Sequence, residues 1–376
     1  MRLDSIDLYR VRLPLVYPFR TAYGDAHAIE SVLVRMQGVG AAGWGEATPW
    51  ESPRYSPEWA AGAYSLARDW LAPQLVGRDI GSGAELQAVL APFKGNPFAK
   101  AALDLAWWDL EARLRGKPLW QLVGGRSDRV EVGADFGVME TVAALLDSVA
   151  GACAAGFKRV KLKFRPGWEI DVVRAVRLAF PDLVFHVDCN AAYALSDLEL
   201  FRALDELAPA MVEQPLAHDD LLDHARLQRQ IRTPVCLDES ITSPRAARQA
   251  LEVGACRYLN VKPGRVGGIT PALEILEAGR EAGVSCWIGG MLESAIGASH
   301  CLALATLPGV SYPSDIFPSR RFYDHDLTRP EIELAGPSVI RAFDGPGIGC
   351  QPEGEVLAVR TVESCTVRPS TVSASC

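Results

Sequence analysis

From about residue 130 onward, short runs of β-branched and hydrophobic residues alternate with longer stretches of helical periodicity. The β-type runs are VEVGADFGV, KRVKLKF, LVFHVD, AMVE, PVCLDE, RYLNVK, VSCWIGG and a weaker one near 309–316. Helical composition falls between them, at 193–207, 217–231, 243–253 and 270–282. This alternation predicts an α/β fold of the (β/α)8 type, a closed parallel barrel. An open doubly wound sheet is the alternative, but no G-x-G-x-x-G follows the first strand.

The N-terminal part of the chain has a different pattern. It predicts strands at 3–16 and 31–37, then helices at 59–75, at 84–93 and in FAKAALDLAWWDLEARLRG, where Gly116 and Pro118 mark the end of the last helix. Residues 319–360 are rich in Pro and Gly, and the residues after them are small and polar. We therefore expect an α+β capping domain at 1–125, a catalytic barrel at 126–318, a return segment on the capping domain at 319–360 and a disordered tail at 361–376.

Composition narrows the class of partner. The chain carries a net charge of −8 without a long basic run, which disfavours nucleic acid and anionic membranes. No segment has the ~18 consecutive apolar residues of a membrane helix, and the N-terminus has strand composition and not that of a signal peptide. The nine cysteines are an odd number without a C-x-x-C pair, so we expect them to be reduced and mostly buried. A cytoplasmic protein is the expectation.

Acidic and basic residues stand at the carboxyl ends of the predicted barrel strands. Asp188, Glu213 and Asp238 follow one another at intervals of 25 residues, and Lys262 comes 24 residues later. One β/α unit has about that length, so these side chains should lie at the same level on successive strands. In a parallel barrel that level is the mouth, where active sites are built.

The residue types at this level suggest their chemistry. Three carboxylates without a soft ligand suit a hard cation, Mg²⁺ first and Mn²⁺ second, and the six histidines lack zinc-site spacing. A proton beside a carboxylate becomes removable when the resulting enediolate is stabilised by such a cation. Lys161 and Lys163 share one face of their strand, and Lys262 comes from four strands farther on. A neutral lysine, its pKa lowered by burial and nearby cations, could act as the base.

Lysine bases with Mg²⁺ are the known pattern of the enolase superfamily, and the chain resembles that superfamily, in its muconate-lactonizing branch, over nearly its whole length. The motifs that carry the resemblance are KLK at 161–163, DCN at 188–190, EQP at 213–215, DES at 238–240 and NVKPGRVGG at 260–268. Within the branch, GGMLES at 289–294, PSDI near 314 and PGIG at 346–349 resemble the o-succinylbenzoate synthase / N-succinylamino acid racemase group.

The resemblance implies a role for each matching residue. Lys163 and Lys262 would be the acid/base pair, and Asp188, Glu213 and Asp238 would bind Mg²⁺. Lys161 would contact the substrate carboxylate, and an arginine at the position of Arg265 accompanies racemase ability in this group. Residues implied to support the metal or to contact the substrate are Asn190, Glu239, Phe19, Tyr23, Gly290, Met291 and Leu292. The substrate would be a small carboxylate, and the protein would be a homo-oligomer, a dimer or an octamer.

Asp135 departs from the pattern of the group, which usually carries a small hydroxyl residue there. If its side chain points into the pocket, it either disfavours a dianionic substrate or is held by Lys161. The leading function is dehydration to o-succinylbenzoate, a step of menaquinone biosynthesis, and the alternative is racemisation of N-succinyl- or N-acylamino acids.

Other functions fit the sequence less well. A dipeptide epimerase would carry D-x-D on the last strand, but Phe317 follows Asp315, and a muconate cycloisomerase-like activity ranks with it. A mandelate-racemase-like dehydratase would have a histidine where GGMLES stands. A non-catalytic binding protein would have lost a metal carboxylate or a lysine, and all of them are present.

Overall fold

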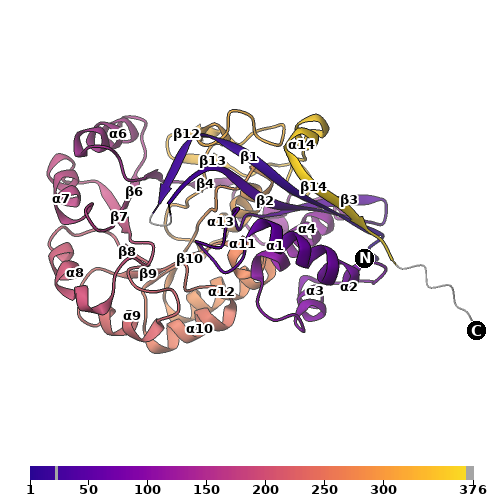
Figure 1. Cartoon of the computed structure of the whole chain (residues 1–376), viewed down its shortest axis with the longest axis horizontal. Helices are drawn as coiled ribbons and strands as arrows, with labels where there is room; N and C mark the ends of the chain where they lie inside the picture. Colours follow the sequence, from indigo (N-terminus) through magenta and orange to yellow (C-terminus); the bar gives the residue numbers. More distant parts are fainter. Residues whose placement is uncertain (22–23, 370–376) are drawn as a thin grey trace, which may run out of the picture.

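The computed structural model describes residues 1–21 and 24–369. Figure 1 shows a barrel beside a smaller domain made by the two ends of the chain. The core of the barrel and the core between the capping sheet and its helices are separate hydrophobic clusters. Among the described residues, no helix is long and apolar enough to cross a membrane.

The capping domain is an antiparallel sheet packed on helices. Its strands, in the order β14-β1-β2-β3, are β1 (Ser5–Thr21), β2 (Gly24–Gly38), β3 (Ala41–Ala47) and β14 (Thr361–Val367). The helical segments are α1 (Ala60–Leu66), the π-helical η1 (Ala67–Leu71), α2 (Ala72–Leu75), α3 (Gly83–Leu90), α4 (Pro97–Leu114) and α5 (Leu119–Leu122). The longest helix, α4, packs against β3, where Gly43 and Gly45 allow close approach of the two backbones.

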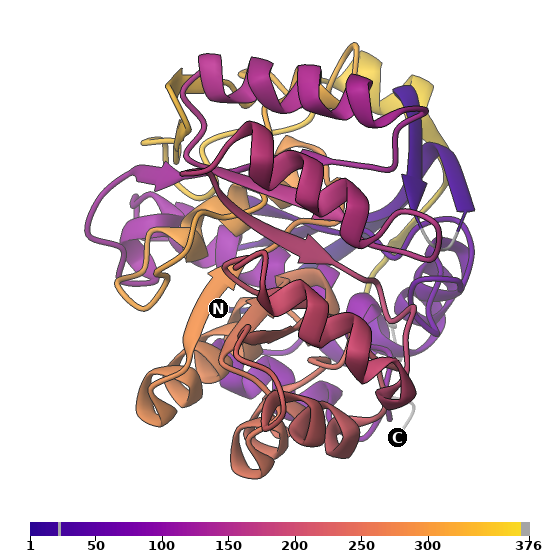
Figure 2. The same ribbon diagram turned by 90° about the vertical axis from the view of Figure 1, so that its left-hand side faces the viewer.

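The barrel strands form one parallel sheet in the order β11-β10-β9-β8-β7-β6-β5. They are β5 (Ala134–Phe136), β6 (Arg159–Lys163), β7 (Val184–Asp188), β8 (Val212–Glu213), β9 (Val235–Leu237), β10 (Tyr258–Val261) and β11 (Ser285–Ile288). The helical segments around them are α6 (Val142–Ala154), α7 (Ile170–Ala179), η2 (Leu195–Asp197), α8 (Leu198–Asp205), α9 (Leu221–Gln228), α10 (Pro244–Val253), α11 (Pro263–Val266), α12 (Ile269–Ala282) and α13 (Ala295–Ala305). Figure 2, turned toward the barrel, shows α6 to α10 as its outer layer.

The segment that closes the barrel is the weak run expected near 309–316. Val310 forms an isolated parallel bridge with Cys286 of β11, and Ser314 forms one with Val132, just before β5. The backbone N–H of Asp315 also donates to the carbonyl of Ile288 at 2.9 Å. This segment therefore joins the last strand to the first through single bridges and is not a regular eighth strand.

The C-terminal part returns across both domains. It contains η3 (Ser319–Arg321), β12 (Leu334–Gly336), β13 (Val339–Arg341) and α14 (Gly354–Arg360), and β13 pairs with β4 (Arg129–Glu131) at the start of the barrel. The prediction of a disordered tail from residue 361 is wrong for 361–367. These residues alternate between half-buried and exposed positions and pair antiparallel with β1, so TVESCTV is an edge strand of the capping sheet. Residues 370–376 lie outside the described residues.

Candidate active site

Most of the predicted site residues line one cavity between the barrel mouth and the capping domain. The lining residues are Phe19, Trp50, Tyr55, Asp135, Lys161, Lys163, Asp188, Asn190, Lys262, Gly290, Met291, Leu292, Asp315, Phe317 and Phe322. The charged members come from β5, β6 and β7, from the residue after β10 and from the closing segment, and most of the aromatic members come from the capping domain or the return segment. The cavity therefore has a charged floor and an aromatic roof.

The three predicted metal carboxylates end or follow three successive strands, and all are buried. Asp188 ends β7, Glu213 ends β8 and Asp238 directly follows β9. Glu213 Oε1 accepts a hydrogen bond from Asn260 Nδ2 at 2.7 Å, but its Oε2 accepts none from the described residues. Burial, with the neighbouring charge of Asp188, raises the pKa of Glu213 to about 8. Holding this carboxylate ionised requires more positive charge than its neighbours supply.

That orphaned oxygen and the all-carboxylate donor set fit a hard divalent cation. In the described part of the chain, no three acidic, histidine or cysteine side chains already converge as a ligand set. Lysine ammonium groups lie among the carboxylates instead, since Lys161 Nζ is 3.8 Å from Asp188 Oδ2 and 3.7 Å from Glu213 Oε2. The donor chemistry fits Mg²⁺, and Asp188, Glu213 and Asp238 are the residues that would hold it.

The two predicted acid/base lysines approach the cavity from opposite sides. Lys163, at the end of β6, donates to Asp188 Oδ2 at 2.7 Å and to Asn190 Oδ1 at 2.7 Å. Lys262, which directly follows β10, donates to Asp238 Oδ2 at 2.9 Å. Because β6 and β10 are four strands apart in the sheet, a substrate between them has one ammonium group on each face.

The expectation that lysine pKa values are lowered here is wrong for Lys262. Burial, the largest single effect, lowers its pKa, but the adjacent Asp238 carboxylate and Tyr55 together outweigh burial and raise the pKa above its usual range. In the same way, Arg265 and Lys262 overcome burial and hold the pKa of Asp238 below its usual range. The sequence argument counted neighbouring cations but not the carboxylate in direct contact.

Asp238 belongs to a cluster of contacting side chains that the sequence analysis did not predict. The Arg265 guanidinium donates to its Oδ1, and Tyr55 Oη lies 3.4 Å from its Oδ2. Tyr55 also accepts from Arg265 at 2.6 Å and from Lys262 at 3.2 Å. Since Tyr55 comes from the loop before α1, it connects the capping domain to the predicted base, and no barrel-strand motif could reveal it.

Lys161 does point into the cavity, but it is held by two carboxylates. Its Nζ donates to Asp315 and lies 3.1 Å from Asp135 Oδ2. Arg159, two residues earlier on the same face of β6, contacts the other oxygen of each carboxylate. Of the two alternatives for Asp135, the structure has the one in which Lys161 holds it. The roles of Arg159 and Asp315 were missed, although the R-x-K-x-K alternation of β6 signals a third inward cation.

Of the two supporting residues predicted beside the metal carboxylates, Asn190 contacts Asp188, and Glu239 contacts Asn190. The Asn190 backbone N–H donates to Asp188 Oδ1 at 3.1 Å, and its side-chain amide donates to Glu239 Oε1 at 3.1 Å. Asn190 has a positive φ of 45°, which asparagine tolerates better than most residues. This backbone turn lets one residue serve both a carboxylate and Lys163.

The roof of the cavity consists of aromatic rings from both domains. Phe19 stands edge-on to Trp50 and Phe322, with ring centres 6.2 and 6.0 Å apart, and Phe317 is 5.2 Å from Phe322. Trp50 Nε1 donates to the carbonyl of Met291 at 3.0 Å, which ties the capping domain to the GGMLES loop. Tyr23, predicted to lie with Phe19, falls outside the described residues.

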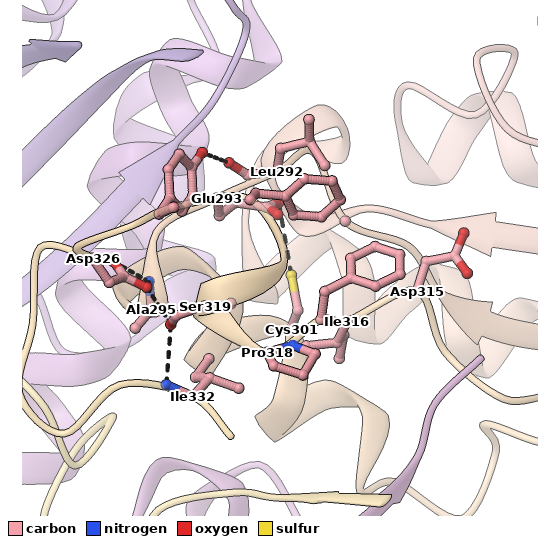
Figure 3. A pocket seen from close by; sticks show the side chains of 15 residues that line it. Leu292, Glu293, Ala295, Cys301, Asp315, Ile316, Pro318, Ser319, Asp326 and Ile332 are labelled. Atoms are coloured by element: carbon pink, nitrogen blue, oxygen red, sulfur yellow. Dashed lines mark hydrogen bonds between the residues drawn. The ribbon is translucent and has the colours of Figure 1, made fainter. Parts of the chain in front are cut away.

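A second, small cavity adjoins the first, and Leu292 and Phe317 line both of them. Figure 3 shows the side chains that line this second cavity. Glu293 lies on its wall, where Oε2 accepts the backbone N–H of Met291 at 2.7 Å and burial raises its pKa to about 7. Asp326 accepts from the backbone N–H of Ala295 at 3.1 Å, at the start of α13. These contacts brace the loop that carries Gly290, Met291 and Leu292 against the barrel.

Comparisons with known proteins agree with this site. The model of the mandelate racemase / muconate lactonizing enzyme N-terminal domain matches residues 5–124, and the enolase C-terminal domain-like model matches 144–356. The chain is 41% identical to an N-succinylamino acid racemase of Thermus thermophilus over the whole of both chains. It is 41% identical to an o-succinylbenzoate synthase of Geobacillus kaustophilus over 93% of each chain.

A solved structure of the same superfamily also superimposes on this chain over nearly its whole length. An enolase-superfamily protein from Listeria innocua superimposes with a TM-score of 0.95 at 35% identity, covering 98% of this chain and 99% of that one. The predicted resemblance and the predicted barrel with its capping domain are therefore confirmed. The chain belongs to the enolase superfamily, in the mandelate racemase / muconate lactonizing enzyme family.

Proposed function

We propose that this protein is a Mg²⁺-dependent enzyme that removes the proton α to a substrate carboxylate and passes through an enediolate. The observation that carries the proposal is the placement of Lys163 and Lys262 on opposite sides of one cavity at the barrel mouth, where three buried carboxylates stand at the ends of successive strands. Such a site supplies acid/base groups to both faces of a bound carbon atom and a binding place for a hard cation.

Each group has a task in this reaction. Lys161 binds a substrate carboxylate oxygen, and bound Mg²⁺ would supply positive charge that stabilises the enediolate. One of Lys163 and Lys262, in its neutral form, takes the α-proton from the face that it meets. The aromatic roof made by Phe19, Trp50 and Phe322 covers the site and keeps water from the enediolate.

The first candidate reaction is o-succinylbenzoate synthase. One lysine would remove the α-proton of 2-succinyl-6-hydroxy-2,4-cyclohexadiene-1-carboxylate, and the hydroxyl on the neighbouring carbon would leave as water. The curated relatives with this name support it, at 35–41% identity. This dehydration needs one basic lysine, with the other as a fixed cation.

The second candidate is racemisation of N-succinyl- or N-acylamino acids, and one observation favours it. Lys262 is built into a contact set with Asp238, Arg265 and Tyr55 that fixes its ammonium group toward the cavity. A racemase needs this second group as much as the first, because the proton leaves from one face and returns to the other. Relatives from Thermus thermophilus and Amycolatopsis carry the racemase name.

Two assays separate the candidates. Formation of o-succinylbenzoate from the cyclohexadiene carboxylate is followed by absorbance, and α-proton exchange of N-succinylphenylalanine in D₂O is followed by NMR, both with Mg²⁺. Activity in the first alone supports the synthase, in the second alone the racemase, and in both a bifunctional enzyme. Absence of both activities would overturn the proposed chemistry. A homo-oligomer, also proposed, is tested by light scattering on the same sample.

A further inference from the structure

Four charged side chains at the seam of the barrel form a closed ring. Asp135 Oδ1 is 3.0 Å from the Arg159 guanidinium, and its Oδ2 is 3.1 Å from Lys161 Nζ. Asp315 repeats the arrangement, with Oδ1 2.5 Å from Arg159 and Oδ2 bonded to Lys161. Each carboxylate thus bridges the same two cations through separate oxygens. We call these four residues the seam ring.

The members of the seam ring differ in what they can touch. Asp135, Lys161 and Asp315 line the cavity, whereas the Arg159 side chain is 1% exposed and lies beneath them. Arg159 packs over the Trp287 and Tyr312 rings, at 5.7 and 5.6 Å. No substrate can reach Arg159, so any effect that it has on the reaction must act through the other three.

The backbone around Arg159 leaves space for its side chain and accepts a hydrogen bond from it. A Cβ at Gly133 would lie 2.0 Å from the Arg159 guanidinium carbon, so the backbone before β5 leaves room for this side chain only by having glycine there. The guanidinium also donates to the carbonyl of Pro313 at 2.6 Å. Both contacts lie where β5, β6 and the closing segment meet.

The net charge of the seam ring determines whether a substrate carboxylate can approach Lys161. The ring contains two cations and two carboxylates, so it is neutral as a whole. Its three cavity-lining members alone would present two carboxylates to one ammonium group, and a substrate carboxylate would then be repelled from Lys161. Arg159 supplies the second positive charge of the ring, because its guanidinium pairs with one oxygen of each of the two carboxylates.

We propose that Arg159 and Asp135 are positioning residues whose opposite charges balance each other, so that Lys161 stays oriented and keeps its positive charge available to the substrate carboxylate. The role concerns the substrate-binding step and rests on the proposed function. Asp135 in this arrangement does not act as a lone repelling charge. The two charges should therefore compensate for each other when both are removed.

The test compares Arg159→Gln, Asp135→Asn, the double variant and the charge-conserving Arg159→Lys. The readouts are the Kd of o-succinylbenzoate with Mg²⁺, by calorimetry, and KM and kcat for the substrate that the wild type turns over. Arg159→Gln should raise Kd and KM roughly ten- to a hundredfold, with a smaller change in kcat. Asp135→Asn and Arg159→Lys should each stay within about tenfold of wild type, and the double variant should recover most of the loss.

Arg113→Gln is the matched control, because it removes an arginine paired with buried Asp109 at 2.8 Å in the capping domain. It should lower stability without changing Kd or KM. A double variant that binds as poorly as Arg159→Gln, or worse, would overturn the proposal, because a purely structural role gives additive losses. If Arg159→Gln does not fold, the double variant is the test. A Kd of the double variant that is tenfold or more above that of wild type would then contradict the proposed charge compensation. The Kd readout does not need turnover, so an inactive wild type would overturn the proposed function and leave this test intact.

Discussion

Lys262 Nζ donates to Asp238 Oδ2 at 2.9 Å, so one of the two proposed bases is bound directly to a proposed metal carboxylate. The contact raises the lysine pKa and lowers that of the aspartate. If Asp238 binds the metal and Lys262 acts as the base, as proposed, metal binding would compete with this ion pair and would be coupled to the protonation state of Lys262.

Metal dependence is the first prediction. Removal of divalent cations with EDTA should abolish α-proton exchange, and Mg²⁺ or Mn²⁺ should restore it more fully than Zn²⁺. Asp238→Asn should weaken Mg²⁺ binding by at least tenfold in calorimetry, because it removes one of three carboxylate charges. The variant should still fold, but its melting temperature should fall, because the substitution leaves the buried Arg265 and Lys262 without the carboxylate charge that pairs with them. Full activity in metal-free enzyme would contradict the site assignment.

The two lysines should serve opposite enantiomers. Wild type in D₂O should exchange the α-proton of both N-succinylphenylalanine enantiomers. Lys163→Ala should lose exchange with one enantiomer by 100-fold or more, and Lys262→Ala with the other, on the order of the loss of a general base. NMR of each enantiomer separately gives the rates. If either variant still exchanges both enantiomers at the wild-type rate, the two-sided geometry is wrong.

The contacts that the sequence revealed and those that it hid differ in how the chain makes them. Asp188, Glu213 and Asp238 recur with the period of a β/α unit, so their shared level on the barrel follows from local pattern. Arg159 and Asp315 meet across 156 residues at the closing seam, which has single bridges and no regular strand. Tyr55 reaches Lys262 from the other domain, 207 residues away. Such pairings depend on packing that no local period encodes.

Close packing of β3 on α4 gives a stability prediction. A Cβ at Gly45 would lie 2.3 Å from the carbonyl oxygen of Ala102 and 2.4 Å from the backbone nitrogen of Ala106. Gly45→Ala should therefore lower the free energy of unfolding by about 1–3 kcal/mol, the usual cost of overpacking. Gly151→Ala is the control, because Gly151 lies in α6 with nothing within 4 Å. It should leave stability unchanged or raise it by about 0.5–1 kcal/mol. The measurement is urea unfolding of wild type, Gly45→Ala and Gly151→Ala. Equal unfolding midpoints for wild type and Gly45→Ala would contradict the prediction.

The last prediction concerns the pH dependence of stability at the start of α4. Glu58 is 7% exposed and accepts the backbone N–H groups of Phe98 at 2.9 Å and Ala99 at 3.1 Å. Burial raises its pKa from 4.5 to about 7, although the two N–H groups oppose the shift. The folded chain therefore keeps a proton that the unfolded chain has released between these pH values. The stability contributed by this group is fully present below about pH 4.5 and is lost as pH rises to about 7, by a few kcal/mol in all.

Substitution isolates that contribution. Glu58→Gln cannot titrate, so its free energy of unfolding should fall less between pH 5 and pH 8 than that of wild type, by roughly 2–3 kcal/mol. Glu85→Gln is the matched control, because Glu85 also accepts a backbone N–H near a helix start, from Gly81 at 2.7 Å, but is exposed. Its pH profile should parallel that of wild type. If the Glu58→Gln profile also runs parallel to wild type from pH 5 to 8, Glu58 is ionised throughout, and the N–H groups of α4 stabilise its charge more than burial opposes it.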